Sequence, residues 1–321
     1  MKKALLALFL LFPALAQPLP EALKKAQEAA GVTLARMEVE AKAKDLARLL
    51  QDPLLTPLSE LQARQALALA EAKYRRALAQ AESDLVAAYT QALEAGIQVR
   101  LAAKALEVAE LSLKAAEVRA KGGGATSLDL LEASNRVLEA RKNLDLAQKG
   151  LGSARAALEN LVGPWKPEPV AELPPLPEKG VVEDLLRAHA DLLQLRQSLE
   201  LLRFQRGLLD EGFAPRKDIE ALEDQIKAVG TNLENLERSL RVGLEARYAQ
   251  LSPLLQGVKA AEEAYRAAKE RYAAEEKRFR AGLASRLSLL QAELSLLQAE
   301  LSWEQAKHAY LKAHYGLLAS R

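Results

Sequence analysis

Residue types that carry out catalysis or bind metal ions are sparse in this chain of 321 residues. Cysteine is absent, which excludes disulfides, thiol catalysis and cysteine-based metal sites. His308 and His314 are six positions apart and so lie on different faces of a helix, unlike the i, i+4 pair of a zinc-binding helix. The third histidine is His189, and no Ser/His/Asp or paired-carboxylate arrangement stands out from the many glutamates. We therefore expect no enzyme activity, no catalytic residue, no metal site and no cofactor.

The composition is typical of long helices. Half of the residues are hydrophobic, 27% are charged and only 4% are aromatic. Alanine, leucine, glutamate, lysine and arginine dominate, as they do in coiled coils. The 45 basic and 43 acidic side chains leave a net charge of +2, which gives no electrostatic basis for binding a polyanion. We expect no nucleic-acid partner.

Residues 1–16 have the features of an export signal. Two lysines precede an apolar run from Ala4 to Leu15, and an A-x-A cleavage pattern ends at Ala16. The run has about a dozen residues, too few to span a bilayer, and no later segment approaches the roughly 20 apolar residues of a membrane helix. We expect residues 1–16 to be a signal peptide and the mature protein to be exported to the periplasm.

A proline-rich stretch divides the remainder into two halves. Six of the 13 prolines fall between Pro164 and Pro177, which predicts an extended linker because proline fixes φ and lacks a backbone donor. We expect a first helical repeat at 17–163, a linker at 164–180 and a second helical repeat at 181–321. The expected helices lie near residues 20–50, 58–121, 126–162, 181–209, 216–280 and 285–318.

Apolar residues in the long helices recur at alternating spacings of four and three. This 3.5-residue repeat keeps one face toward a partner helix and produces left-handed supercoiling. The helix at 58–121 would be about 95 Å long at ~1.5 Å per residue, far longer than a compact domain needs. The repeat positions are Tyr74, Leu78, Ala81, Leu85, Ala88, Ala92, Ala95, Val99, Ala102, Leu106, Ala109, Leu113 and Ala116, followed by Ala133, Val137, Ala140, Leu144, Ala147, Leu151, Ala154 and Leu158.

The two halves are related by a constant offset, which indicates an internal duplication. Arg119 and Arg278 are 159 positions apart. A shared repeat of Ala and Leu would not by itself also bring an arginine, a glycine and a tyrosine into one register. The same offset relates Tyr89 to Tyr248, Gly123 to Gly282, Ala125 to Ala284, Leu128 to Leu287, Ala133 to Ala292, Ala140 to Ala299, Ala147 to Ala306 and Leu158 to Leu317.

The glycines at these positions predict a tight turn between two helices in each half. Gly122 to Gly124 can supply the positive φ that ends a helix. Thr126 suits an N-cap, with Asp129 at the third helical position as in a capping box. In the second half Gly282 ends one helix and Ser285 caps the next. A phosphate-binding loop is the alternative, but neither GxxxxGK[ST] nor a GxGxxG after a strand is present.

These residues resemble a known family, the outer-membrane efflux proteins or TolC-like channels. In that family each repeat carries an R-x-x-x-G-x-x-[ST]-x-x-D-x-x-x-A turn followed by an Ala-rich helix. The first copy here reads RAKGGGATSLDLLEA from Arg119, with one extra residue before the aligned glycine, and the second reads RFRAGLASRLSLLQA from Arg278. The proline-rich crossover after Gly163 and the Ala88-Tyr89 pair also resemble the family, and the resemblance covers nearly all of the mature chain.

The resemblance implies an all-α protomer made of two duplicated long antiparallel coiled-coil helical hairpins. Three such protomers form a periplasmic α-barrel of twelve helices, a homotrimer that acts as a passive conduit for efflux or type I secretion at the outer membrane. Its partners are a periplasmic adaptor (membrane fusion) protein and an inner-membrane pump. The adaptor-contact hairpin tips implied here are Gly122, Gly123, Gly124, Gly282 and Leu283, and the candidate gate or tip polar residues are Arg119, Asp129, Glu132 and Arg278.

Two departures from the family pattern are visible. The usual transmembrane β-strands between helices are missing, since only Pro53–Pro57 and Gly212–Pro215 are available at those places. The second turn has Ser288 and Gln291 where many relatives carry acidic residues that constrict the pore, whereas the first turn keeps its acidic pair.

Two other functions fit parts of the pattern. A non-conducting periplasmic coiled-coil scaffold or spacer, derived from the same family, would explain the missing strands. An adaptor protein would also contain long antiparallel helices, but adaptors flank a single hairpin with β-rich modules. The two hairpins at a fixed offset favour the conduit over the adaptor.

Overall fold

The computed structural model describes residues 16–209 and 213–321, and these are almost entirely helical. The expected signal peptide at 1–16 lies, up to residue 15, outside the described residues. Within the described part, no helix combines the length and apolar character needed to cross a membrane. The elements are β1 (Ala16–Gln17), α1 (Leu19–Lys25), the 3-10 turn η1 (Ala26–Glu28), α2 (Ala30–Leu49), α3 (Pro57–Lys121), α4 (Ser127–Val162), β2 (Lys166–Pro167), α5 (Val181–Ala188), α6 (Ala190–Gly207), α7 (Arg216–Arg280) and α8 (Arg286–Leu318).

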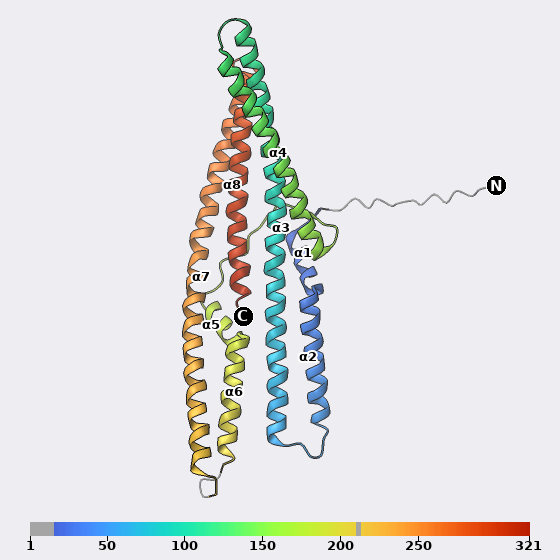
Figure 1. Ribbon diagram of the computed structural model, residues 1–321, viewed down its shortest axis with the longest axis vertical. Helices are drawn as coiled ribbons and strands as arrows, with labels where there is room; N and C mark the ends of the chain where they lie inside the picture. The colour runs from blue at the N-terminus through green and yellow to red at the C-terminus, as the bar shows by residue number, and fades with distance from the viewer. Residues whose placement is uncertain (1–15, 210–212) are drawn as a thin grey trace, which may run out of the picture.

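Two helices of 65 residues each, α3 and α7, run the length of the molecule (Figure 1). At ~1.5 Å per residue each is about 97 Å long. Toward one end α4 packs on α3 and α8 packs on α7, and toward the other end α2 packs on α3 and α6 packs on α7. Helix α3 also contacts α8 and α6, so the two hairpins lie side by side along their length. The predicted all-α fold of two long antiparallel hairpins is therefore confirmed.

The two long hairpins have matching dimensions. Helices α3 and α7 begin at Pro57 and Arg216 and end at Lys121 and Arg280, so that both pairs of bounds differ by 159. The starts of α4 and α8 differ by the same number. This is the offset that relates the turn residues in the sequence. The boundaries of the two repeats and of the linker stay a prediction.

Two of the expected helices are interrupted. The helix expected at 20–50 breaks at Ala29, which has an extended ψ of 140°, and the helix expected at 181–209 breaks at His189, with ψ of 120°. Each break lets the short segment before it turn its own apolar face to the core, because a straight helix could bury only one continuous stripe. Leu19 and Ala22 are buried before the first break, and Val182, Leu185 and Leu186 before the second.

The proline-rich crossover is held firmly against the helices. The Tyr89 hydroxyl donates to the carbonyl of Glu168 and accepts from its N–H, both at 2.9 Å. Tyr248 and Tyr310 donate to the carbonyls of Pro177 (3.1 Å) and Pro174 (2.8 Å). Strand β2, at the start of the crossover, pairs in parallel with β1. Prolines leave carbonyls without matching N–H groups, and phenol donors from the helices satisfy several of them.

Two apolar clusters form the core, one centred on each hairpin, and the first also contains Leu311 of α8. The first gathers residues of α1, α3, α4 and the crossover around Leu85, Tyr89 and Leu158. The second gathers residues of α5, α7 and α8 around Leu251 and Tyr310. Trp303 packs against the second cluster, and its ring stacks on that of Tyr265 with the ring centroids 5.0 Å apart. Alanines at the repeat positions keep the paired helices close.

Candidate functional site

The α3–α4 turn closes by a glycine-dependent Schellman arrangement. The N–H of Gly124 donates to the carbonyl of Arg119 at 2.8 Å, and the N–H of Gly123 donates to that of Ala120 at 3.0 Å. Gly123 has a φ of +73°, a left-handed conformation that a side chain would strain. The turn stands at one end of the molecule (Figure 1).

The first turn of α4 carries the predicted capping box. Thr126 Oγ1 accepts from the N–H of Asp129 at 3.2 Å, and the Asp129 carboxylate accepts from the Thr126 N–H at 2.7 Å and from its hydroxyl at 2.8 Å. These bonds from Thr126, the backbone N–H first, lower the pKa of the Asp129 carboxyl below its usual value. The negative charge is therefore retained at the helix N-terminus, where the dipole also favours it.

Three of the four candidate polar residues come together at this turn. Arg119, Asp129 and Glu132 line a surface pocket of about 210 Å³ with Arg136 on its rim. Glu132 and Arg136 are 3.8 Å apart, one helical turn from each other. The pocket has carboxylates and guanidinium groups in roughly equal number, all exposed to solvent, so it suits polar contacts with another surface better than capture of a small ion.

The α7–α8 turn repeats the backbone geometry at the same end of the molecule. Gly282 has a φ of +71°, and the N–H of Leu283 donates to the carbonyl of Arg278 at 2.8 Å. Ser285 caps α8 by accepting from the N–H of Ser288 at 3.0 Å. The Leu283 side chain is 73% exposed, an apolar group at the outermost part of the turn.

Glu275 is a tip residue that the sequence pattern did not single out. Its side chain is only 14% exposed; one oxygen accepts from the Ser288 hydroxyl, and the other lies 3.0 Å from Arg278. The residue one offset earlier is Ala116, a buried repeat position on α3. Extending the apolar repeat across the duplication would have placed Glu275 facing α8. The second turn thus keeps a carboxylate, supplied by α7 instead of α8.

A ladder of ion pairs joins the first hairpin to the second along the α3–α8 contact. Lys104 lies 2.7 Å from Glu107 and 3.1 Å from Glu293. Although burial alone would lower the pKa of Lys104, its bonds to these two carboxylates outweigh it and raise that pKa. Arg286, at the start of α8, lies 3.1 Å from Glu107, and Arg100 pairs with Glu300 farther from the tips. The ladder fixes the register in which the two turns reach the same end.

The ladder ends in a buried polar cluster near the crossover. His308 is fully buried, with Nδ1 2.9 Å from Glu94 and Nε2 3.5 Å from Glu304. Lys307 bonds to Glu304 at 2.6 Å and to the carbonyl of Val170 at 3.2 Å. Sequence reasoning set His308 aside as unsuited to zinc. The structure gives it a packing role between α3 and α8, and none of the described residues forms a cluster of three or more metal-ligating side chains.

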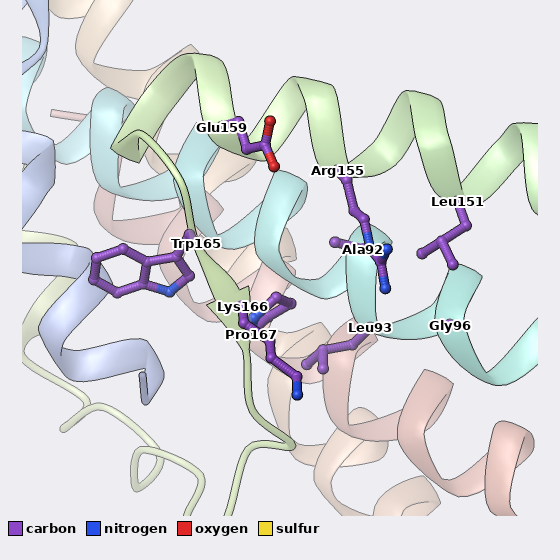
Figure 2. Close-up of a pocket in the computed structure, with 9 residues that line it drawn as sticks. All are labelled: Ala92, Leu93, Gly96, Leu151, Arg155, Glu159, Trp165, Lys166 and Pro167. Atoms are coloured by element: carbon purple, nitrogen blue, oxygen red, sulfur yellow. The ribbon is translucent and has the colours of Figure 1, made fainter. Parts of the chain in front are cut away.

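A larger pocket of about 340 Å³ lies where α3, α4 and the crossover meet (Figure 2). Arg155 and Leu151 extend from α4 toward α3 at Ala92 and Gly96, whereas the Trp165 ring lies on the other side of the crossover. Arg155 and the other charged groups that line it are exposed. The pocket therefore lacks the convergent, buried polar groups of a catalytic site.

Comparisons with known proteins bear on the family and on the fold. Residues 208–320 match a family model described as outer membrane efflux protein. A search of curated proteins gave no match. The Campylobacter jejuni CmeC outer membrane channel is similar with a TM-score of 0.67 at 12% identity, over 94% of this chain and 85% of that one.

Two further solved structures are similar over nearly the whole chain. VceC, an outer membrane protein of Vibrio cholerae, has a TM-score of 0.63 at 16% identity, covering 94% of this chain and 95% of that one. A membrane protein from Pseudomonas aeruginosa has a TM-score of 0.66 at 16% identity, covering 94% and 89%. At these identities the likeness establishes the fold. Residues 208–320 therefore resemble the outer membrane efflux proteins in sequence, and nearly the whole chain shares the fold of these solved structures.

Proposed function

We propose that this protein is a TolC-like component of an envelope efflux or type I secretion system that forms a passive helical conduit. The observation that carries the proposal is the pair of equivalent turns at one end of two long hairpins. A passive role fits the tips, where the polar residues are exposed and engaged in caps and ion pairs. The protein would be exported to the periplasm and associated with the outer membrane.

The conduit would be a homotrimer. One protomer supplies four long helical segments side by side toward the tip end, α4, α3, α8 and α7, and three protomers would supply twelve. Closed rotational symmetry of this kind pairs one edge of each protomer with the opposite edge of the next. The edges are α4 and α7, and both expose apolar side chains there, among them Leu138, Leu146 and Val242.

The tips would dock a periplasmic adaptor protein, and through it an inner-membrane pump. Glycines Gly122, Gly123, Gly124 and Gly282 keep the turns narrow, and Leu283 offers an exposed apolar contact. Around them Arg119, Asp129, Glu132 and Arg278 would make the polar contacts that open or close the end of the conduit. Asp129 would act with its charge held by Thr126, because that pairing favours the ionised carboxylate.

Site-specific photo-crosslinking in the producing cells tests the docking role. A photoreactive amino acid at Leu283 should crosslink to an adaptor protein, identified by mass spectrometry. The same group at Leu34 is the matched control, because that side chain is 66% exposed and lies on α2, which packs on α3 at the end opposite the tip. Equal crosslinking of the adaptor from both positions, or none from Leu283, would remove the docking role from the tips.

A further inference from the structure

His308 lies at the contact between the two hairpins, with a carboxylate beside each of its ring nitrogens. Nδ1 lies 2.9 Å from Glu94 of α3, and Nε2 lies 3.5 Å from Glu304, one turn earlier on α8. The ring is fully buried, and the Glu304 side chain is 8% exposed. Among the described residues, Nε2 and the Glu304 oxygen that faces it are buried without a hydrogen-bond partner. The ring therefore has two acidic neighbours but a regular hydrogen bond to only one of them.

The two carboxylates are already balanced by lysines. Lys307 pairs with the other oxygen of Glu304 at 2.6 Å and donates to the carbonyl of Val170 in the crossover, and Lys312 lies 3.4 Å from Glu94. No third carboxylate among the described residues pairs with the ring. Although burial alone would raise the pKa of Glu94, the bonds from the ring and from Lys312 outweigh it and lower that pKa, so this carboxylate keeps its charge. Charge balance thus does not require a second proton on the ring, and such a proton is free to come and go with pH.

A neutral imidazole cannot satisfy both neighbours. It carries one N–H, so either Glu94 or Glu304 would face a nitrogen that is itself an acceptor. The bond to Glu94 places the single hydrogen on Nδ1, which leaves two acceptors facing each other at Nε2. A proton on Nε2 turns that contact into an attraction. It also makes the donor to Glu94 a charged one, and charge-assisted hydrogen bonds are roughly twice as strong as neutral ones.

A surface pocket gives the proton a route to the buried ring. Glu304 lines this pocket of about 240 Å³, which lies between α3, α8 and the crossover. At its mouth Arg100 and Glu300 pair with each other, with side chains 54% and 25% exposed. Gly96 of α3 also lines the pocket, and an added Cβ there would meet nothing within 4 Å. The Glu304 carboxylate therefore connects solvent with the Nε2 atom without any separation of the helices.

We propose that His308 is a proton-sensitive link between the two hairpins. With both ring nitrogens protonated, it bonds α8 firmly to Glu94 of α3, and loss of the proton on Nε2 weakens that bond. Because the proton strengthens the link, the α3–α8 contact should be more stable at lower pH. This link operates within one chain and goes beyond the proposed function. It holds or fails independently of adaptor docking and of the number of chains.

Nuclear magnetic resonance of the histidine rings tests the protonation in the unsubstituted chain. The chain has three histidines, so a ¹⁵N-histidine label reports on three rings, which single substitutions assign. Between about pH 8.5 and about pH 5 the His308 ring should pass from one bound proton, on Nδ1, to two. A ring that keeps a single proton over this whole range, or two protons over this whole range, would overturn the proposal.

Hydrogen exchange of the α8 amides tests whether the proton changes the contact. After correction for the intrinsic exchange rate, protection around His308 should rise on acidification by up to about tenfold per pH unit. Glu304→Gln offers an amide N–H to the unprotonated Nε2, so protection in that variant should stay high and lose its rise on acidification. His189→Gln is the matched control, because it removes a histidine outside this cluster, and it should keep the rise. A rise that survives in Glu304→Gln, or titration of His308 without any change in protection, would contradict the link.

Discussion

At the scale of single residues, buried polar side chains hold the crossover and the two hairpins together. Tyr89 is fully buried and bonds to both backbone groups of Glu168. Burial, the largest effect, raises the pKa of its phenol to about 12, so the hydroxyl is neutral and can both donate and accept. His308 and Lys307 likewise connect α8 to its neighbours, His308 through Glu94 of α3 and Lys307 through the carbonyl of Val170 in the crossover. Such groups specify one arrangement, because each unpaired partner would be costly when buried.

Replacing Tyr89 by phenylalanine should lower stability. The substitution keeps the ring but leaves the N–H and carbonyl of Glu168 without their partner, which predicts a loss of about 1–3 kcal/mol in the free energy of unfolding. Denaturant unfolding followed by circular dichroism measures it. Tyr272→Phe is the matched control, since no hydrogen bond of that hydroxyl is found within the described residues, and it should change stability by less than about 0.5 kcal/mol. Equal effects from both substitutions would remove the crossover role of Tyr89.

Acidification should destabilise the protein in part through His314. Burial lowers the pKa of His314 below 6.5, so the folded state favours the neutral ring. The stability it contributes is complete above pH 6.5 and is lost as the pH falls through the folded-state pKa, by up to about 1.4 kcal/mol per pH unit. His314→Leu should reduce the difference in unfolding free energy between about pH 7.5 and about pH 5. His189, whose pKa burial also lowers, remains in the variant, so some difference should persist. An unchanged difference would show that His314 does not titrate in this way.

At the scale of elements, the sequence patterns predicted helix bounds well wherever a cap or a glycine marks the end. The bounds of α3 and α7 were expected within a residue or two, because Thr56, Gly123 and Gly282 stand at their ends. The break at His189 could not be predicted, because histidine does not usually end a helix. The extended conformation there depends on how the residues before it pack into the core. The backbone geometry of the first turn was predicted from the residue types of Gly123 and Thr126. The partly buried position of Glu275 could not be predicted in this way, because charged runs on helices are usually solvated.

The two turn glycines should be intolerant of alanine, in contrast to a glycine within a helix. Gly123→Ala and Gly282→Ala place a side chain at positive φ and should each cost about 1 kcal/mol or more. Gly150→Ala is the control: it lies within α4, and an added Cβ would meet nothing within 4 Å. That substitution should stabilise by about 0.5–1 kcal/mol. Thermal unfolding of the three variants measures whether each substitution lowers or raises stability. Destabilisation by all three would contradict the assignment of strain to the turns.

At the scale of the whole molecule, the two long helices, each about 97 Å, run side by side, and the proposed trimer would pair the α4 edge of one protomer with the α7 edge of the next. The α3–α8 ion ladder and the clamped crossover fix the two hairpins in one register, so that both turns project together. The turn between α2 and α3 lies at the opposite end of the molecule.

The solution mass of residues 17–321, measured by light scattering after size exclusion without detergent, tests the central claim most directly. Closure into a twelve-helix conduit predicts a stable mass of three chains that does not change on dilution. A monomer that persists at high protein concentration would contradict the conduit. The two hairpins would then serve as a non-conducting periplasmic scaffold or spacer.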